Sequence, residues 1–97
     1  MQSYKLTQKA DCDLEYIFNY GIDHFGLDLA ITFYQGLSGT FDKITHNPEY
    51  YPTVDEILPR YRRAIFKSYS IFFIQKQSHI EITRVLRKEL IDASFFE

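Results

Sequence analysis

The sequence has little of three features that would each identify a class of protein. It contains one cysteine, Cys12, which excludes an internal disulfide framework and is typical of a reducing compartment. Its longest uninterrupted apolar run, residues 71–74, is far too short to cross a membrane. No apolar run follows a basic stretch near residue 1, so we expect no signal peptide. We therefore predict a cytoplasmic protein that makes no membrane contact.

Aromatic and apolar residues, by contrast, are plentiful. Nine Phe and eight Tyr, with no Trp, make up 18% of the 97 residues, and 45% of all residues are hydrophobic. A chain of this length can bury one core between two layers of secondary structure. We therefore expect a single domain over residues 1–97, with the aromatic side chains either in its core or on a surface that a partner covers.

Charge is divided unevenly along the chain, although the net charge is only −2. Residues 1–59 have nine acidic and three basic side chains, a net charge of −6. Residues 60–88 have eight basic side chains and one acidic side chain, a net charge of +7, and residues 89–97 return −3. A segment this basic attracts acidic partners at long range. The alternative is a solvated sheet face paired with the acidic helices, and charge alone does not choose between them.

Apolar spacing predicts a short strand and two consecutive helices in the first half of the chain. Residues 3–6 alternate as a strand does and lead into Thr7, a good helix N-cap. Helical spacing follows over residues 8–25. Gly26 ends this helix, because glycine tolerates left-handed geometry, and a second helix continues until just before Pro48. Helices joined by so short a turn form an antiparallel hairpin.

Three strands are predicted in the second half. Residues 48–59 contain all three prolines and form a connecting loop, whereas residues 61–66, 69–75 and 80–86 are rich in β-branched and aromatic side chains. The economical packing is an α+β fold, in which a helical hairpin covers a mainly antiparallel sheet in the order β-α-α-β-β-β. The core residues that we expect are Leu14, Ile17, Phe18, Phe33, Leu37, Phe41, Ile71 and Phe73.

Several short segments occur in an order and spacing that are specific only when taken together. They are Tyr4-Lys5-Leu6-Thr7, Asp13-Leu14, Phe25-Gly26, Asn47-Pro48, Tyr61-Arg62-Arg63, Tyr69 with Ile71-Phe72-Phe73, and Ile82 with Arg84-Val85-Leu86. In this order they resemble the RelE/ParE toxin superfamily, and within it the ParE-like branch, over essentially the whole chain.

The resemblance implies the toxin of a bacterial type II toxin–antitoxin pair. Such a toxin is neutralised by the C-terminal segment of a small antitoxin, ParD-like or related. Members of the ParE branch inhibit DNA gyrase, whereas members of the RelE branch cut mRNA on the ribosome, and one fold serves both activities. DNA would be reached only indirectly, through the antitoxin complex.

The residues available for chemistry favour the gyrase inhibitor. Cleaving RNA needs a base, an acid and cations for the phosphate, and the RNA-cleaving branch usually has a Tyr or His just after the last strand. Here the last tyrosine is Tyr69, and Arg87 occupies the position where many relatives have histidine. His24, His46 and His79 fall at helix ends and in a turn, without metal-ligand spacing. We therefore expect no catalytic residue, no metal and no cofactor. Two alternatives stay open: the RelE-type endoribonuclease, and a homologue that binds antitoxin but has lost toxicity.

Two interaction surfaces are predicted. The antitoxin would place apolar side chains in a groove along the helical hairpin and carboxylates beside arginines, whose rigid guanidinium suits a carboxylate. Strand alternation also leaves one apolar face of the sheet uncovered by helices. The antitoxin-binding residues would be Arg62, Arg63, Phe72, Ile74 and Arg84. The gyrase-binding residues, at the end of the last strand and in the tail, would be Arg84, Arg87, Lys88, Leu90 and Phe95. The alternative for the tail is that Leu90 and Phe95 only seal the sheet.

Overall fold

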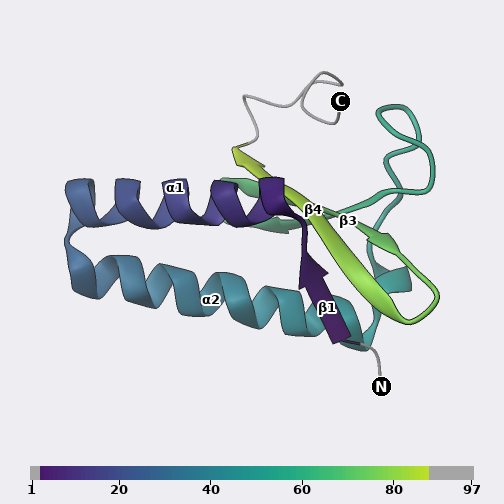
Figure 1. Cartoon of the computed structure of the whole chain (residues 1–97), viewed down its shortest axis with the longest axis horizontal. Helices are drawn as coiled ribbons and strands as arrows, with labels where there is room; N and C mark the ends of the chain where they lie inside the picture. Colours follow the sequence, from purple (N-terminus) through teal and green to yellow (C-terminus); the bar gives the residue numbers. More distant parts are fainter. Residues whose placement is uncertain (1–2, 88–97) are drawn as a thin grey trace.

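The chain folds in the predicted order of strand, two helices and three strands, as a computed structural model that describes residues 3–87 shows (Figure 1). Its elements are β1 (Ser3–Leu6), α1 (Gln8–Phe25), α2 (Leu27–His46), a short 3-10 turn (Pro48–Tyr50), β2 (Arg62–Phe66), β3 (Tyr69–Gln75) and β4 (His79–Arg87). Every bound that we predicted lies within one residue of the bound observed. No helix among residues 3–87 is both long enough and apolar enough to cross a membrane.

Two residues set the limits of α1. The Thr7 hydroxyl oxygen accepts a hydrogen bond from the Ala10 amide at 3.1 Å and donates one to the Thr83 carbonyl of β4 at 2.9 Å. Gly26, at φ +91°, donates its amide to Ile22 of α1 and accepts the Ala30 amide of α2. This φ suits glycine, because a residue with a Cβ atom is strained there. One residue therefore reverses the chain and forms the helical hairpin.

The sheet has four strands in the order β1-β4-β3-β2. β1 runs parallel to β4, whereas the β2–β3 and β3–β4 pairs are antiparallel. The pairing of β3 with β4 shifts between Phe72 and Phe73, which leaves Thr83 of β4 as an extra residue. This bulge reverses the side-chain alternation of β4, so Ile82 and Val85 both join the core beneath the helices.

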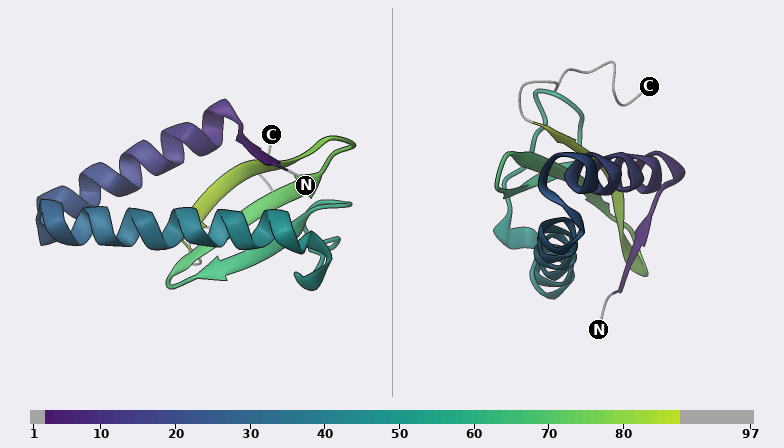
Figure 2. Two further views of the ribbon diagram at one scale, coloured as in Figure 1. Left: turned by 90° about the horizontal axis from the view of Figure 1, so that it is seen from below. Right: turned by 90° about the vertical axis from the view of Figure 1, so that its left-hand side faces the viewer.

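The helical hairpin covers one face of this sheet (Figures 1 and 2). Six of the eight predicted core residues are buried there, namely Leu14, Ile17, Leu37, Phe41, Ile71 and Phe73. Phe33 is half-buried and packs against the same cluster. The prediction for Phe18 is wrong, because Phe18 is only half-buried and lies outside the core cluster, in edge-to-face contact with Tyr34.

The opposite face of the sheet is covered by the proline-rich connection rather than by helices. The Val54 amide donates to the Tyr61 carbonyl at 2.9 Å, so the connection folds back beside β2. Val54 then packs with Phe72 and Leu86 in a second, smaller cluster. The prediction that helices leave this face uncovered is confirmed, but the expectation that its apolar side chains are exposed for contact is wrong: Phe72 is 0% and Ile74 is 8% exposed.

The helical hairpin is offset from the sheet beneath it. α1 and α2 rise about 27 and 30 Å; the nine residues of β4 span about 30 Å, but the five residues of the edge strand β2 span only about 17 Å. The left view of Figure 2 shows the hairpin extending beyond one end of the sheet. Apolar side chains near the hairpin tip consequently have no sheet to cover them.

Candidate protein-binding pocket

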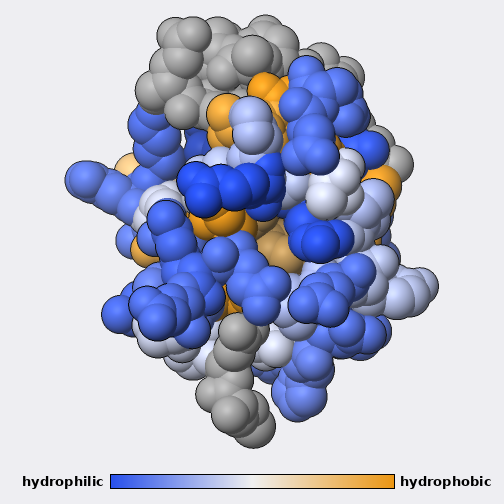
Figure 3. Space-filling view, turned by 90° about the vertical axis from the view of Figure 1, so that its right-hand side faces the viewer, coloured by the Kyte–Doolittle hydropathy of each residue, from blue (hydrophilic) through white to orange (hydrophobic). Residues whose placement is uncertain are grey.

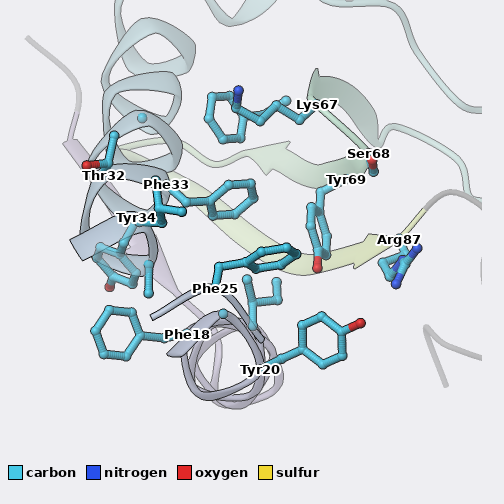
Figure 4. Close-up of a pocket in the computed structure, with 16 residues that line it drawn as sticks. Phe18, Tyr20, Phe25, Thr32, Phe33, Tyr34, Lys67, Ser68, Tyr69 and Arg87 are labelled. Carbon is cyan, nitrogen blue, oxygen red and sulfur yellow. The ribbon is translucent and has the colours of Figure 1, made fainter. Parts of the chain in front are cut away.

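A pocket of about 720 Å³ lies where the helical hairpin leaves the sheet (Figure 4). Its walls come from the C-terminal half of α1, the N-terminal half of α2, the β2–β3 turn and the end of β4. Its aromatic lining residues are Phe18, Tyr20, Phe25, Phe33, Tyr34, Phe66 and Tyr69. A mostly apolar hollow of this size can accept several side chains of a partner.

The floor of the pocket is a packed group of aromatic rings. Phe33 of α2 meets Phe66 and Tyr69 edge-to-face, with ring centroids 5.3 and 5.6 Å apart. Phe66 also lies against the α2 backbone, because a Cβ atom on Gly36 would come within 2.7 Å of the end of its ring. The missing side chain at Gly36 therefore makes room for the ring that forms the floor.

The rim exposes large apolar side chains. Phe25 is 63%, Leu29 is 60% and Tyr34 is 40% exposed. A cluster of exposed apolar side chains around a hollow is typical of an interaction surface. The end of the molecule away from the hairpin tip, seen in Figure 3, is mostly hydrophilic, with apolar surface only in small patches.

Two basic side chains, Lys67 and Arg87, also line the pocket. Lys67 begins the two-residue turn between β2 and β3 at φ +54°, and its ammonium group lies 5.7 Å from the Phe66 ring centroid. Arg87 is exposed at the end of β4. Apolar walls with cations beside them suit a ligand that offers both apolar side chains and carboxylates.

Arg84, which we predicted in both interaction surfaces, already has a carboxylate partner. Its Nε and Nη2 atoms donate to the two carboxylate oxygens of Asp13 at 2.8 and 2.9 Å, and both side chains are 14% exposed. The hydrogen bond to Asp13 raises the pKa of the Arg84 guanidinium, although burial opposes this rise. Asp13 of the same chain therefore already binds this guanidinium through two of its nitrogens, and the part of Arg84 in antitoxin and gyrase binding stays a prediction.

Arg62 and Arg63 lie away from the pocket and on opposite faces of β2. Arg62 is paired with Phe73 and Arg63 with Phe72, and neighbouring residues of a strand face opposite ways. The Arg62 Nη1 atom donates to the Tyr51 carbonyl at 2.6 Å. Arg63 is half-buried, and its Nε atom has no hydrogen-bond partner within residues 3–87. Both arginines cannot face one peptide strand together, and their part in antitoxin binding stays a prediction.

Of the gyrase-binding residues predicted in the last strand and tail, the structure places Arg87 at the pocket. Lys88, Leu90 and Phe95 lie outside the described residues. The contribution of this set to target binding therefore stays a prediction.

The pocket rim was missed by the sequence analysis. Phe25, Leu29 and Tyr34 follow the same helical spacing as core residues, so periodicity alone does not separate them from the core. The sequence does not give the offset between the hairpin and the sheet, and that offset is what leaves these side chains uncovered.

His24 and His46 lie at helix ends, as predicted, whereas His79 is the first residue of β4 rather than part of the turn before it. With the proton on Nδ1, His24 donates to the Tyr20 carbonyl at 2.9 Å and His46 donates to the Asp42 carbonyl at 2.8 Å. His79 begins β4. Within the described part of the chain, no group of three or more His, Cys, Asp or Glu side chains could hold a metal ion.

Comparisons with known proteins agree on one family. The model of the family described as ParE toxin of type II toxin-antitoxin system, parDE, matches residues 4–90. Toxin ParE1 of Mycobacterium tuberculosis is 30% identical over 88 residues, 90% of each chain. Toxin ParE1 of Caulobacter vibrioides is 27% identical over 90 residues, 93% of each chain. A solved structure, the chromosomal ParDE TA system from P. aeruginosa, has the same fold, with a TM-score of 0.79 at 24% identity over 90% of this chain and 96% of that chain.

Proposed function

This chain belongs to the ParE toxin family of type II toxin–antitoxin systems, and from that membership we propose that it inhibits DNA gyrase by binding, without catalysing a reaction. We also propose that the C-terminal segment of a ParD-like antitoxin neutralises it. Contact with DNA would then be indirect, through the antitoxin complex.

The pocket is the observation that carries the antitoxin proposal. Phe25 and Leu29 expose more than half of their surface to water. Exposed apolar side chains gathered around a pocket are typical of a surface that a partner covers. An amphipathic segment that placed apolar side chains on the Phe33–Phe66 floor would remove this surface from water. The ParDE name of the P. aeruginosa structure points to the same kind of partner.

The charges around the pocket change where the carboxylates of the antitoxin would bind. Lys67 and Arg87 line the pocket, whereas Arg84 is not among its lining residues. We therefore assign the electrostatic part of antitoxin binding to Lys67 and Arg87. Positive side chains beside an apolar pocket speed the encounter with an acidic segment and orient it.

Family membership and the end of β4 support a mode of action without catalysis. Cleavage of RNA would need a general base beside the phosphate. The last residue of β4 is Arg87, whereas His24 and His46 lie in the last turns of the two helices and His79 begins β4.

The test is a direct comparison of the two possible targets with the purified protein. We expect inhibition of gyrase supercoiling with accumulation of cleaved DNA, and no cleavage of mRNA on programmed ribosomes. Cleavage of ribosome-bound mRNA with normal gyrase activity would replace this proposal with the RNA-cleaving alternative. If a preparation that binds antitoxin affects neither target, the chain is a homologue that has lost toxicity.

A further inference from the structure

The outer edge of β2 is only partly covered. β2 ends the strand order β1-β4-β3-β2, so one of its edges has no neighbouring strand in the sheet. The proline-rich connection pairs with the first half of this edge, where the Arg63 amide donates to the Pro52 carbonyl at 3.1 Å. Hydrogen-bonded and non-hydrogen-bonded pairs alternate along an antiparallel ladder, so the amide and the carbonyl of Ile65 point outward as the Arg63 amide does. Within the described part of the chain, neither of these Ile65 groups has a backbone partner, and the second half of the edge is therefore open.

The side chains of Arg63 and Ile65 lie on one face of this edge. Ala64 and Phe66 pack into the core beneath the helices, so Arg63 and Ile65 point to the opposite face of the sheet. Ile65 is 52% exposed. Arg63 is half-buried, its Nε atom is buried without a hydrogen-bond partner, and no carboxylate of residues 3–87 pairs with its guanidinium. A buried donor without an acceptor is unfavourable, so a carboxylate from another molecule would be stabilised beside Arg63.

Positive charge surrounds the open edge. Residues 57–80 contain five Lys or Arg side chains and no Asp or Glu. The exposed Lys67 follows Ile65 by two residues, just as Arg63 precedes it by two. A second copy of the chain would fit poorly, because antiparallel pairing centred on Ile65 would place Arg63 of one copy opposite Lys67 of the other. Lysine beside an edge strand is a common device against such pairing. An acidic strand, by contrast, would be attracted at both positions.

We propose that the open edge of β2 binds an extended acidic segment of another protein, which adds a strand to the sheet. The main chain of the segment would pair with the outward amide and carbonyl of Ile65, and its side chains would provide specificity. Alternate residues of a strand share a face, so an apolar side chain would lie opposite Ile65 and acidic side chains two residues to either side, near Arg63 and Lys67. This surface is separate from the pocket, because neither Arg63 nor Ile65 lines the pocket. Binding here therefore does not depend on which proteins contact the pocket.

A synthetic peptide tests this binding in the full chain. The probe is a capped peptide that contains Glu-Thr-Val-Thr-Glu, and the matched control peptide has Lys in place of both Glu. By NMR of the isotope-labelled chain, we expect the acidic peptide to slow hydrogen exchange of the Ile65 amide several-fold. It should also bind at least about tenfold more tightly than the basic peptide. Unchanged exchange of the Ile65 amide at millimolar acidic peptide would overturn the proposal. Resonance shifts confined to pocket residues such as Phe25 and Leu29 would overturn it too, because the peptide would then lie in the pocket.

Substitutions at the edge separate the part of the main chain from that of the side chains. Ile65→Pro removes an amide that has no partner in the sheet, so this variant should fold and lose binding of the acidic peptide. Ile65→Val keeps the amide and is the matched control, with an affinity within about twofold of the unsubstituted chain.

Arg63→Gln is an independent variant that leaves the backbone unchanged. It should weaken binding of the acidic peptide at least about fivefold and reduce the preference for the acidic over the basic peptide. Undiminished affinity for the acidic peptide in this variant would contradict the proposal, whether or not Ile65→Pro folds. A dimer of the peptide-free chain that Ile65→Pro disperses would also overturn it, because a second copy would then occupy the edge.

Discussion

Arg84 of β4 and Asp13 of α1, 71 residues apart in sequence, form a two-pronged ion pair with 2.8 and 2.9 Å hydrogen bonds. One carboxylate oxygen of Asp13 also accepts the amide of Val85 at 3.0 Å. One side chain of the first helix therefore satisfies both a guanidinium and a backbone amide of the last strand. The pair holds α1 against β4, so Arg84 contributes to the fold.

Asp13→Ala should destabilise the chain by about 2–4 kcal/mol, because it leaves a mostly buried guanidinium and the Val85 amide without their partner. Denaturant unfolding measures the change. The control is Glu15→Ala. Glu15 is an exposed acidic residue within one helical turn of Asp13, and its removal should change the free energy of unfolding by less than about 0.5 kcal/mol. Equal losses in the two variants would show that the ion pair contributes little.

Two glycines of α2 provide a matched pair of substitutions. A Cβ on Gly39 would have no atom within 4 Å, so Gly39→Ala should stabilise the helix by about 0.5–1 kcal/mol. A Cβ on Gly36 would come within 2.7 Å of Phe66, so Gly36→Ala must displace that ring and lose most of this gain. Thermal unfolding should therefore rank Gly39→Ala above Gly36→Ala. The reverse order would mean that the Phe66 ring does not rest on α2.

Stability should fall in alkaline solution partly through Tyr51. Burial, and then repulsion by Tyr50, raises the pKa of the Tyr51 hydroxyl above its ordinary value of 10.0. The folded chain holds this proton more tightly than the unfolded chain does. The stabilisation is therefore complete below pH 10.0 and is lost as the pH rises through the folded pKa. Tyr51→Phe should flatten the decline of unfolding free energy above that pH, measured by denaturant unfolding at a series of pH values.

The local features of the fold could be predicted because each depends on neighbours in the sequence. Thr7 caps its own helix, Gly26 turns the chain by itself, and the short turns between strands fix which strands pair. The surroundings of the Phe72 and Arg84 side chains, in contrast, depend on segments that are distant in the sequence. Phe72 is covered by Val54 and Arg84 is paired with Asp13, and neither partner is visible from local spacing.

The candidate pocket escaped prediction for a related reason. Phe25 and Leu29 follow a helical stripe that lies over the sheet in one part of the hairpin and beyond it in another. Periodicity gives the direction in which a side chain points, but it does not give where the covering layer ends. Lys67 and Arg87 are brought to the same pocket by the pairing of β2, β3 and β4, which places the β2–β3 turn beside the end of β4.

Charge reversal at the pocket should act on the rate of antitoxin binding. Lys67→Glu combined with Arg87→Glu should lower the association rate constant about tenfold or more at low salt, and the difference should shrink as salt is added. Lys76→Glu, an exposed lysine in the β3–β4 turn outside the pocket lining, is the control and should have a much smaller effect. Stopped-flow mixing with a ParD-like antitoxin segment measures these rates. An unchanged rate and salt dependence in the double variant would remove Lys67 and Arg87 from the encounter.

The most direct test of the account is the affinity of the Leu29→Asp variant for the C-terminal segment of a ParD-like antitoxin, measured by titration calorimetry beside the Tyr50→Asp control. If the pocket receives the apolar side chains of the antitoxin, Leu29→Asp should weaken binding at least about 30-fold, because it places a charge against the apolar side chains that would cover Leu29. Tyr50→Asp should weaken it less than about threefold, since a peripheral surface substitution costs only a few tenths of a kcal/mol. Unchanged affinity in a folded Leu29→Asp variant would show that the antitoxin binds elsewhere.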